Sequence, residues 1–394
     1  MSMTTQGMRR GRWFVVLLAV WALGLQVLSA NAAVDLLDLP AMKSAKPGQA
    51  LLLTAAHAGK RLVVAGERGI ILYSDDDGSH WTQAEVPVSV TLTALQFINS
   101  NDGWAVGHDG IVLHTGDSGR TWNKQVDGYR LNQIARQGAE QQVQQATAML
   151  ASATDSDAAQ LRLDQAQFLL DDVTAGSEFG PSRPLLGVWF SNAHDGLVVG
   201  ANGQAFITHD GGLNWASAAR QLNNPEALHY NAIVADAKGD LLIAGEAGKV
   251  YRATPDGSWH TLDSGYGGAL YGILPFEDAN GAEMLLAYGF GGAILRSADL
   301  GATWSRIDLK DKLATLVGAL RLDGGTILLL AQDGTLLRSD DLGLSFISQR
   351  AVASMRVASM VDVADGQAVL MAGLGGLHRV GLGAGKTESG DITK

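Results

Sequence analysis

Four carboxylates in short glycine-bounded turns are the strongest candidates for chemistry in this chain. They are Glu67, Asp109, Glu246 and Asp333, in the segments GERG, GHDG, GEAG and QDG. A retaining or inverting glycosidase places two carboxylates on either side of a glycosidic bond, so these residues raise the hypothesis of sugar hydrolysis. The four turns are far apart in the sequence, and no companion cluster stands beside them. The better interpretation is that they are solvated turn residues.

Other catalytic patterns are absent from the sequence. The nine histidines are scattered without an H-x-x-x-H spacing, cysteine does not occur, and no G-x-S-x-G segment is present. The glycine turns are not followed by helices, which argues against phosphate-cradling loops. We therefore predict no catalytic residue, no metal and no cofactor. The net charge of −11 argues against nucleic acid as a partner.

The glycine turns belong to a repeat that organises most of the chain. A full copy has an apolar run, a turn, a second run, the glycine turn, a third run and the motif S/T-x-D-x-G-x-x-W. The motif is shortened at 254–259, and it ends in Phe346 instead of Trp at 339–346. Successive motifs are 41 to 45 residues apart, except for one step of 93. A period in the low forties with short strands is typical of four-stranded propeller blades. Counting a composite last repeat, we predict an all-β, seven-bladed β-propeller over residues 33–383.

The two ends of the repeat array are incomplete. Residues 34–42 (VDLLDLPAM) are apolar but belong to no repeat, and the last repeat lacks both the Asp motif and a fourth strand. Pairing these two ends would close the ring and leave no open sheet edge. We therefore expect an N-terminal strand to complete the seventh blade, and residues 384–394 to be a flexible tail.

The S/T-x-D-x-G-x-x-W motif, or Asp box, is predicted to be structural. Its hydroxyl and carboxylate can accept hydrogen bonds from the amides of their own turn, and its aromatic residue can fold back onto the sheet. In the glycine turns, by contrast, Gly and Asn accept the positive φ that tight hairpin turns require. The Asp-box carboxylates and aromatic residues are Asp76, Trp81, Asp117, Trp122, Asp210, Trp215, Asp299, Trp304, Asp341 and Phe346.

The long step of 93 residues indicates an insertion between blades two and three. Residues 127–183 are rich in Gln and Ala, and their apolar residues recur at helical spacing in two segments separated by the turn at 154–157. We predict a helical hairpin. Because it leaves a fourth strand and returns to a first strand, it should emerge on the face that carries the glycine turns.

The first residues have the pattern of an export signal. Arg9, Arg10 and Arg12 precede an apolar run, and Ala30-Asn31-Ala32 fits a signal-peptidase site. We predict a signal peptide over residues 1–32. An uncleaved membrane anchor is the alternative, although the apolar run is shorter than the ~20 residues that a spanning helix needs. Without cysteine, neither a lipoprotein anchor nor a disulfide framework is available.

Two repeats carry a family resemblance. The segments FINSNDGWAVG at 97–107 and FSNAHDGLVVG at 190–200 are each followed by a glycine turn and an Asp box. This combination resembles the photosystem II stability/assembly factor family, with its seven-bladed propeller of Asp-box-like (BNR) repeats. The resemblance implies a non-enzymatic exported chaperone that binds subunits of a membrane complex. Relatives in non-phototrophic bacteria are associated with transport or envelope functions, and the long helical insert departs from the phototroph pattern.

We therefore expect a non-catalytic, monomeric assembly factor or scaffold that docks on an integral membrane protein complex, for example a transporter. Its location would be the periplasm, or the thylakoid lumen in a phototroph. The partner surface would combine the helical insert with the glycine-turn residues Glu67, Arg68, His108, Asp109, Asn202, Glu246, Phe290 and Asp333. The alternatives are a carbohydrate-active enzyme, sialidase-like or glycosidase, and a simple ligand-binding propeller. A sialidase needs three arginines on a carboxylate and a Tyr/Glu pair, and no convincing set is present.

Overall fold

The computed structural model describes residues 34–254, 256–309, 312–351, 356–363, 366–383 and 389–391. The predicted signal peptide, residues 1–32, lies outside the described residues. The chain divides into two compact units, Met1–Asp35 and Leu36–Lys394, and the description below concerns the second. None of the helices in the described ranges combines the length and the apolarity that a membrane span requires.

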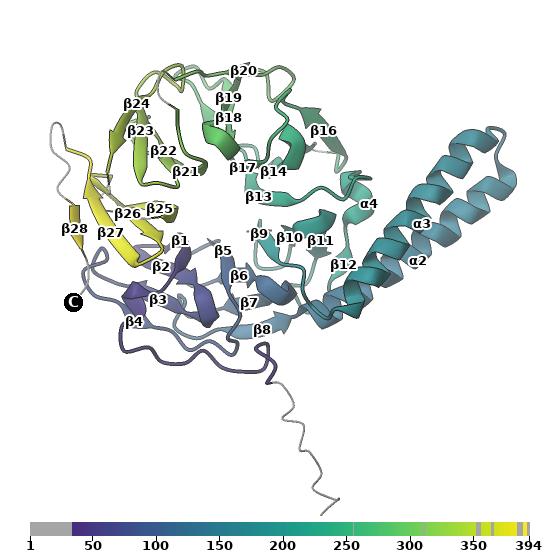
Figure 1. The fold of residues 1–394 in the computed structure, drawn as a ribbon, viewed down its shortest axis with the longest axis horizontal. Helices are drawn as coiled ribbons and strands as arrows, with labels where there is room; N and C mark the ends of the chain where they lie inside the picture. The colour runs from purple at the N-terminus through teal and green to yellow at the C-terminus, as the bar shows by residue number, and fades with distance from the viewer. Residues whose placement is uncertain are drawn as a thin grey trace, which may run out of the picture. The chain divides into compact units, whose positions relative to one another are not determined.

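The described part of the second unit contains seven antiparallel sheets of four strands each, and Figure 1 shows them arranged in a ring. Every sheet follows sequence order from its first to its fourth strand, and the first strands of neighbouring sheets contact one another. This architecture is the predicted seven-bladed β-propeller. Blades one to four comprise β1 (Leu52–Ala58), β2 (Arg61–Gly66), β3 (Ile71–Ser74), β4 (Thr82–Gln83); β5 (Leu92–Phe97), β6 (Gly103–Gly107), β7 (Val112–Thr115), β8 (Asn123–Val126); β9 (Leu185–Phe190), β10 (Gly196–Gly200), β11 (Ala205–Thr208), β12 (Ala216–Ser217); and β13 (Tyr230–Ala235), β14 (Leu241–Gly245), β15 (Lys249–Ala253), β16 (Trp259–Asp263). Blades five to seven comprise β17 (Leu270–Glu277), β18 (Glu283–Gly289), β19 (Ile294–Ser297), β20 (Ser305–Arg306); β21 (Leu316–Arg321), β22 (Ile327–Ala331), β23 (Thr335–Ser339), β24 (Ile347–Arg350); and β25 (Val357–Val363), β26 (Ala368–Gly373), β27 (Gly376–Gly381), β28 (Ser389–Asp391).

The hydrophobic core lies between the blades. Among the residues that the structure describes, seven clusters of buried side chains occur, and each joins two neighbouring blades of the ring. The second strands β2, β6, β10, β22 and β26 are buried at every residue, because a blade is covered on both of its faces. Burial on both faces explains why these strands are near-continuous apolar runs instead of alternating patterns. No blade could bury these residues without its neighbours.

The ring closes differently from the prediction. The fourth strand of blade seven is β28, which pairs with β27, so the expected tail at 384–394 contributes a strand. Residues 34–42 form no strand. The segment runs instead beside blades one and two, where Ala41 N donates to Val86 O at 3.0 Å and Leu37 is buried between the two blades. The prediction of closure by an N-terminal strand was therefore wrong.

Closure between blades seven and one depends on side chains. Leu52 and Leu72 of blade one pack in one cluster with Val361 and Leu370 of blade seven. Between the first strands of the same two blades, His57 Nε2 lies 3.2 Å from Asp362 Oδ1. An apolar interface of this kind joins the first and last blades without a shared strand.

The insertion between β8 and β9 contains α2 (Gly128–Ser152) and α3 (Ser156–Glu178). Asp127 and Asp155 cap the two helices by accepting hydrogen bonds from Arg130 N and Ala158 N. Figure 1 shows an antiparallel pair that leaves the ring beside β12 and extends outward. The prediction placed this hairpin at residues 127–183.

Only the base of the hairpin is part of the core. Leu131 and Ile134 of α2 are buried in the cluster between blades two and three. The base also lies against the glycine turn of blade two, since a Cβ atom on Gly110 would be 2.7 Å from Gly128 Cα. The end formed by residues 147–158 is exposed at nearly every position. The hairpin is therefore anchored at its base and solvated at its tip. A short helix, α4 (Ala219–Leu222), follows blade three.

Candidate functional site: the glycine-turn face and the hairpin

The eight predicted contact residues lie in turns between the second and third strands of blades one to six. In antiparallel meanders of one orientation these turns fall at the same end of each sheet, so they share one face of the ring. We call this the glycine-turn face, formed by residues 66–69, 107–110, 200–203, 245–248, 289–292, 332–334 and 373–376. The predicted residues are distributed around the ring, one or two to a blade. They do not gather into a single catalytic cluster.

Two of the carboxylates hold the framework together. Glu67 Oε1 accepts a hydrogen bond from Leu51 N at 2.9 Å. Glu246 Oε2 accepts one from His229 N at 2.9 Å and lies 3.1 Å from His229 Nδ1. In both blades the carboxylate therefore ties the glycine turn to the residue that leads into the first strand. This engagement makes a glycosidase acid pair an unsuitable role for Glu67 and Glu246.

The remaining predicted residues differ in exposure. Arg68, His108 and Asn202 are exposed, as is Phe290, with 57% of its surface accessible. Asp109 is partly buried. Asp333 is also partly buried and accepts a hydrogen bond from Thr335 N at 3.1 Å.

His229 is a contact residue that the sequence did not single out. It precedes β13, and its Nδ1 lies 3.3 Å from Asn202 N and 3.1 Å from Glu246 Oε2. The side chain thus joins the glycine turns of blades three and four. His229 belongs to no sequence motif, because it is a lone histidine in a connecting segment. Its position just before the first strand of a repeat was the one feature of the sequence that could have identified it.

The glycine turns contain two glycines for two different reasons. At the third and fourth positions φ is positive, 54° at Arg68 and 71° at Gly69. The value at Gly69 agrees with the prediction for glycine, whereas Arg68 has positive φ without being Gly or Asn. At the first position the backbone is extended, with φ −172° at Gly66. A Cβ atom there would lie 1.9 Å from Leu51 O, so this glycine permits a close backbone approach. The sequence prediction of positive φ in these turns therefore applies to their later positions and leaves the first glycine with a different role. In blade six, Ala331 occupies the position that corresponds to Gly66 in blade one. The turn that follows Ala331 is one residue shorter than in blade one.

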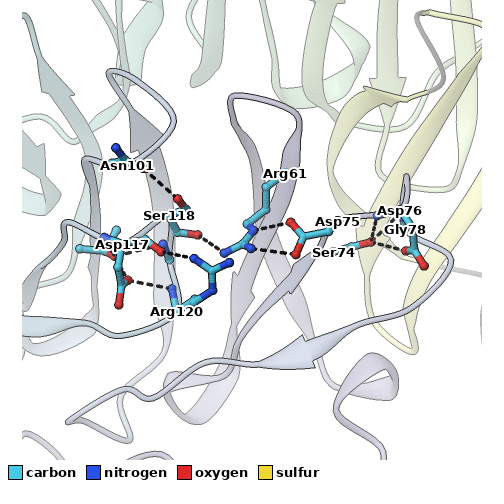
Figure 2. A network of polar contacts seen from close by, with 11 residues as sticks. Arg61, Ser74, Asp75, Asp76, Gly78, Asn101, Asp117, Ser118 and Arg120 are labelled. Carbon is cyan, nitrogen blue, oxygen red and sulfur yellow. Dashed lines mark hydrogen bonds and ion pairs between the residues drawn. The ribbon is translucent and has the colours of Figure 1, made fainter.

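The Asp boxes use their polar groups within their own turns, as Figure 2 shows for blades one and two. In blade one, Ser74 Oγ donates to Asp76 Oδ1 at 2.8 Å and accepts from Gly78 N at 2.9 Å. Trp81 Nε1 then donates to Gly78 O at 2.9 Å. The same hydroxyl-to-carboxylate bond recurs in the boxes of Asp117, Asp210, Asp299 and Asp341. These carboxylates are occupied by the framework.

Neighbouring blades also hold the Asp boxes, a feature that the sequence did not reveal. Arg61 Nη1 donates to Ser118 O at 3.1 Å, Gln125 Nε2 to Gly211 O at 2.6 Å, and Arg296 Nε to Leu342 O at 2.9 Å. Each acceptor is the residue after the box aspartate, and each has positive φ. Arg61 also binds Asp75 through two nitrogens (Figure 2). We call the three hydrogen bonds to Ser118 O, Gly211 O and Leu342 O the inter-blade clamps.

The lowered pKa values of the Asp-box carboxylates lead us to expect that the folded protein loses stability in acid. Hydrogen bonds from His80 and Ser74 lower the pKa of Asp76 to about 2, and bonds from Ser345 and Ser339 do the same for Asp341. Because the folded protein holds these pKa values below the ordinary 3.8, folding is favoured while the groups are ionised. Stability should fall as the pH drops from about 4 to about 2.

Thermal unfolding followed by circular dichroism across this pH range tests the expectation. The Asp341→Asn variant should have a lower midpoint near neutral pH and a flatter decline in acid than the unaltered protein. Parallel declines for the two proteins would contradict the assignment to this box.

Buried carboxylates also meet between blades four and five. Asp236 and Glu283 are 7% and 9% exposed, and Lys238 Nζ lies 3.1 Å from Glu283 Oε2. Burial and the adjacent Asp236 raise the pKa of Glu283. Asp236 Oδ1 is already taken by Lys238 N and Asp240 N. These contacts make the group an inter-blade ion cluster at the end of the blades opposite the glycine turns. Within the described ranges, no group of three or more His, Cys, Asp or Glu residues could hold a metal ion.

The fold and the Asp boxes together define a seven-bladed propeller of Asp-box repeats. The chain belongs to the family described as photosynthesis system II assembly factor YCF48, whose model matches residues 74–167 and 178–379. It is 24% identical over 309 residues to the photosystem II assembly protein Ycf48 of Thermosynechococcus vestitus, across 66% of this chain and 85% of that protein. It is also 24% identical over 341 residues to the chloroplastic photosystem II stability/assembly factor HCF136 of Cyanidioschyzon merolae, across 66% of this chain and 75% of that protein.

Solved structures share the fold. One described as YCF48 bound to D1 peptide has a TM-score of 0.56 at 15% identity and covers 86% of this chain and 97% of that chain. YCF48 from Cyanidioschyzon merolae has a TM-score of 0.57 at 14% identity, with 84% and 95% covered. The WD40 propeller domain of Doa1 has a TM-score of 0.55 at 8% identity, with 87% and 95% covered.

Proposed function

We propose that this chain is an exported, non-catalytic propeller that acts as an assembly or accessory factor for an integral membrane protein complex. The observation that carries the proposal is family membership over most of the chain, together with a structural relative described as bound to a D1 peptide. The protein would act in the periplasm, or in the thylakoid lumen of a phototrophic host. A transporter is the partner class we favour outside phototrophs.

The proposed docking surface combines the hairpin with the glycine-turn face. The base of α2 meets the glycine turn of blade two, so the two surfaces adjoin. The hairpin also exposes large apolar side chains, Leu161 at 59% and Phe168 at 60%. These two residues are seven apart on α3 and therefore share one helical face, which suits contact with another protein.

A carbohydrate-active enzyme is less well supported. Glu67 and Glu246 serve as braces, and the Asp-box carboxylates are hydrogen-bonded within their turns. Enzyme activity lost on substitution of Glu67 or Asp109, in a variant that still folds, would revive that hypothesis. A screen of glycan substrates provides the measurement.

Deletion of the distal hairpin is expected to abolish partner capture and leave the propeller folded. The variant joins Gln142 to Ala166 through a short Gly/Ser turn and so retains Leu131 and Ile134, which belong to the core. Replacing all of residues 128–180 would remove these core residues as well. Tagged full-length and truncated proteins would be compared by crosslinking, capture from the native envelope fraction and mass spectrometry.

An integral membrane protein captured by the full-length protein alone is the expected result. Circular dichroism and thermal unfolding of the truncated form provide the control, and its midpoint should stay close to that of the full-length protein. Equal capture by both forms would remove the hairpin from the docking surface. If neither form captured a membrane protein, the proposed function itself would fail.

A further inference from the structure

A groove of about 300 Å³ lies between the hairpin and the segment at 219–227 that follows blade three. Its apolar lining residues come from both helices: Ala146, Met149, Ala166, Phe168 and Leu169. Met149 is 46% exposed and Phe168 60% exposed. Large apolar side chains facing a concave, partly polar surface are typical of a site that another molecule covers.

Two of the lining residues are arginines. Arg162 of α3 and Arg220 of α4 both line it. The single carboxylate among the lining residues, Asp172, is neutralised by Arg183, whose Nη1 lies 2.9 Å from Asp172 Oδ2. Two guanidinium groups therefore remain to set the charge of the groove, in a protein whose net charge is −11. This local charge favours an anionic occupant.

One hydrogen bond links the two sides of the groove. Arg220 Nη1 donates to Gln145 Oε1 at 2.5 Å and so links the segment after blade three to α2. A smaller adjoining cavity shares Gln142 and Leu169 with the groove and reaches Asn202 of the glycine-turn face. The groove thus leads from the hairpin towards the face on which the partner is proposed to dock.

We propose that this groove binds a peptide segment of the membrane partner in which an apolar residue stands beside a carboxylate. This inference rests on the proposed function and specifies the segment that is recognised. The apolar side chain would cover Met149 and Phe168, which removes apolar surface of both molecules from water. The carboxylate of an Asp, of a Glu or of the partner's last residue would pair with Arg162 or Arg220, because guanidinium groups match carboxylates in a two-bond geometry.

Site-specific photocrosslinking tests the location. A benzoylphenylalanine at Gln165, which lines the groove, is compared with one at Gln167, which is exposed on the same helix outside it. In the native envelope fraction, the probe at Gln165 should crosslink to the captured membrane protein, and the probe at Gln167 should not. The crosslinked peptide, identified by mass spectrometry, should contain an apolar residue next to an Asp, a Glu or the terminal carboxylate.

Charge reversal tests the chemistry. The crosslinked segment would be synthesised with a fluorescent label and titrated against the full-length protein and its Arg162→Glu/Arg220→Glu variant. Affinity should fall by about tenfold or more, since each charge-assisted hydrogen bond contributes on that scale. Arg136→Glu, an exposed substitution on α2 outside the groove, is the matched control and should leave the affinity unchanged.

Three outcomes would overturn the inference while the proposed function stands. The first is capture of a membrane partner without preferential crosslinking at Gln165. The second is a crosslink to another copy of this protein or to a segment without a carboxylate. The third is equal binding by the charge-reversed variant and the control. Absence of any captured membrane protein would instead contradict the proposed function.

Discussion

Substitution of Gly110 by alanine is expected to lower the free energy of unfolding by about 3 kcal/mol. Gly110 has φ 64°, in the left-handed region that costs an L-residue roughly 1–2 kcal/mol. An added Cβ atom would also lie 2.7 Å from Gly128 Cα and 3.0 Å from Gly128 N, both backbone atoms at the start of α2. The backbone must therefore move where the hairpin meets the propeller.

Gly180 provides the matched control. It follows the end of α3, also at the base of the hairpin, with φ 80°, and a Cβ atom there would have nothing within 4 Å. Gly180→Ala should therefore lose only the conformational contribution, roughly 1–2 kcal/mol. Urea unfolding of the three proteins measures both losses. Equal losses would show that the contact with Gly128 does not contribute.

Gly110→Ala should also loosen the base of α2. Native-state hydrogen exchange should be faster in the first turns of this helix, and exchange in blades five and six should be unchanged. Because the hairpin is the proposed docking element, partner capture would then weaken in a protein that still folds. Unchanged exchange in α2 would contradict this account of how the hairpin is seated.

Replacement of Arg61 by methionine is expected to lower the free energy of unfolding by about 2–3 kcal/mol. Arg61 is 7% exposed, binds Asp75 at 2.7 and 2.8 Å, and donates to Ser118 O of blade two. Its guanidinium also lies 4.4 Å from the ring centroid of Tyr73. Methionine keeps much of the apolar stem and removes the charge-assisted hydrogen bonds. Asp75 is 64% exposed, so its charge can return to water, and this limits the loss.

Arg338 offers a comparison of the same residue type. It pairs with Asp340 at 2.9 Å, but the two side chains are 45% and 60% exposed. Solvent screening of such a pair leaves at most about 1 kcal/mol, so Arg338→Met should change stability little. Denaturant unfolding of both variants, with Asp75→Asn completing a double-mutant cycle for Arg61, gives the measurement. Similar losses at Arg61 and Arg338 would refute the inter-blade clamp.

The number of blades could be predicted because each Asp box is encoded locally. The contacts of an Asp box are made within eight residues, as between Ser74, Asp76, Gly78 and Trp81. The motif therefore predicts its turn wherever it occurs in the sequence. The two helices of the hairpin could also be predicted, from the spacing of their apolar residues and from their capping residues. Closure of the ring could not be predicted, because β28 has the sequence Ser-Gly-Asp, without apolar alternation, and no pattern marks it as the partner of β27.

The contact residues show the same division. The sequence placed Glu67 and Glu246 in turns on one face, and this follows from the repeat alone. Their role as braces depends on the close approach of Leu51 and His229, which lie 16 and 17 residues earlier in the sequence. A motif search cannot supply that proximity, and the same argument applies to Arg61 and Ser118, which are 57 residues apart.

The repeat, the Asp boxes, the inserted hairpin and the family resemblance could all be predicted from the sequence, since each depends on residues close together along the polypeptide. The tertiary structure decided which strand completes blade seven, which glycine serves a close approach, and where the arginines and apolar side chains form a groove. Arg162 and Arg220 come from different elements, and Phe168 stays exposed because the hairpin leaves the ring at its base. Such features arise from packing between distant segments, which no local pattern records.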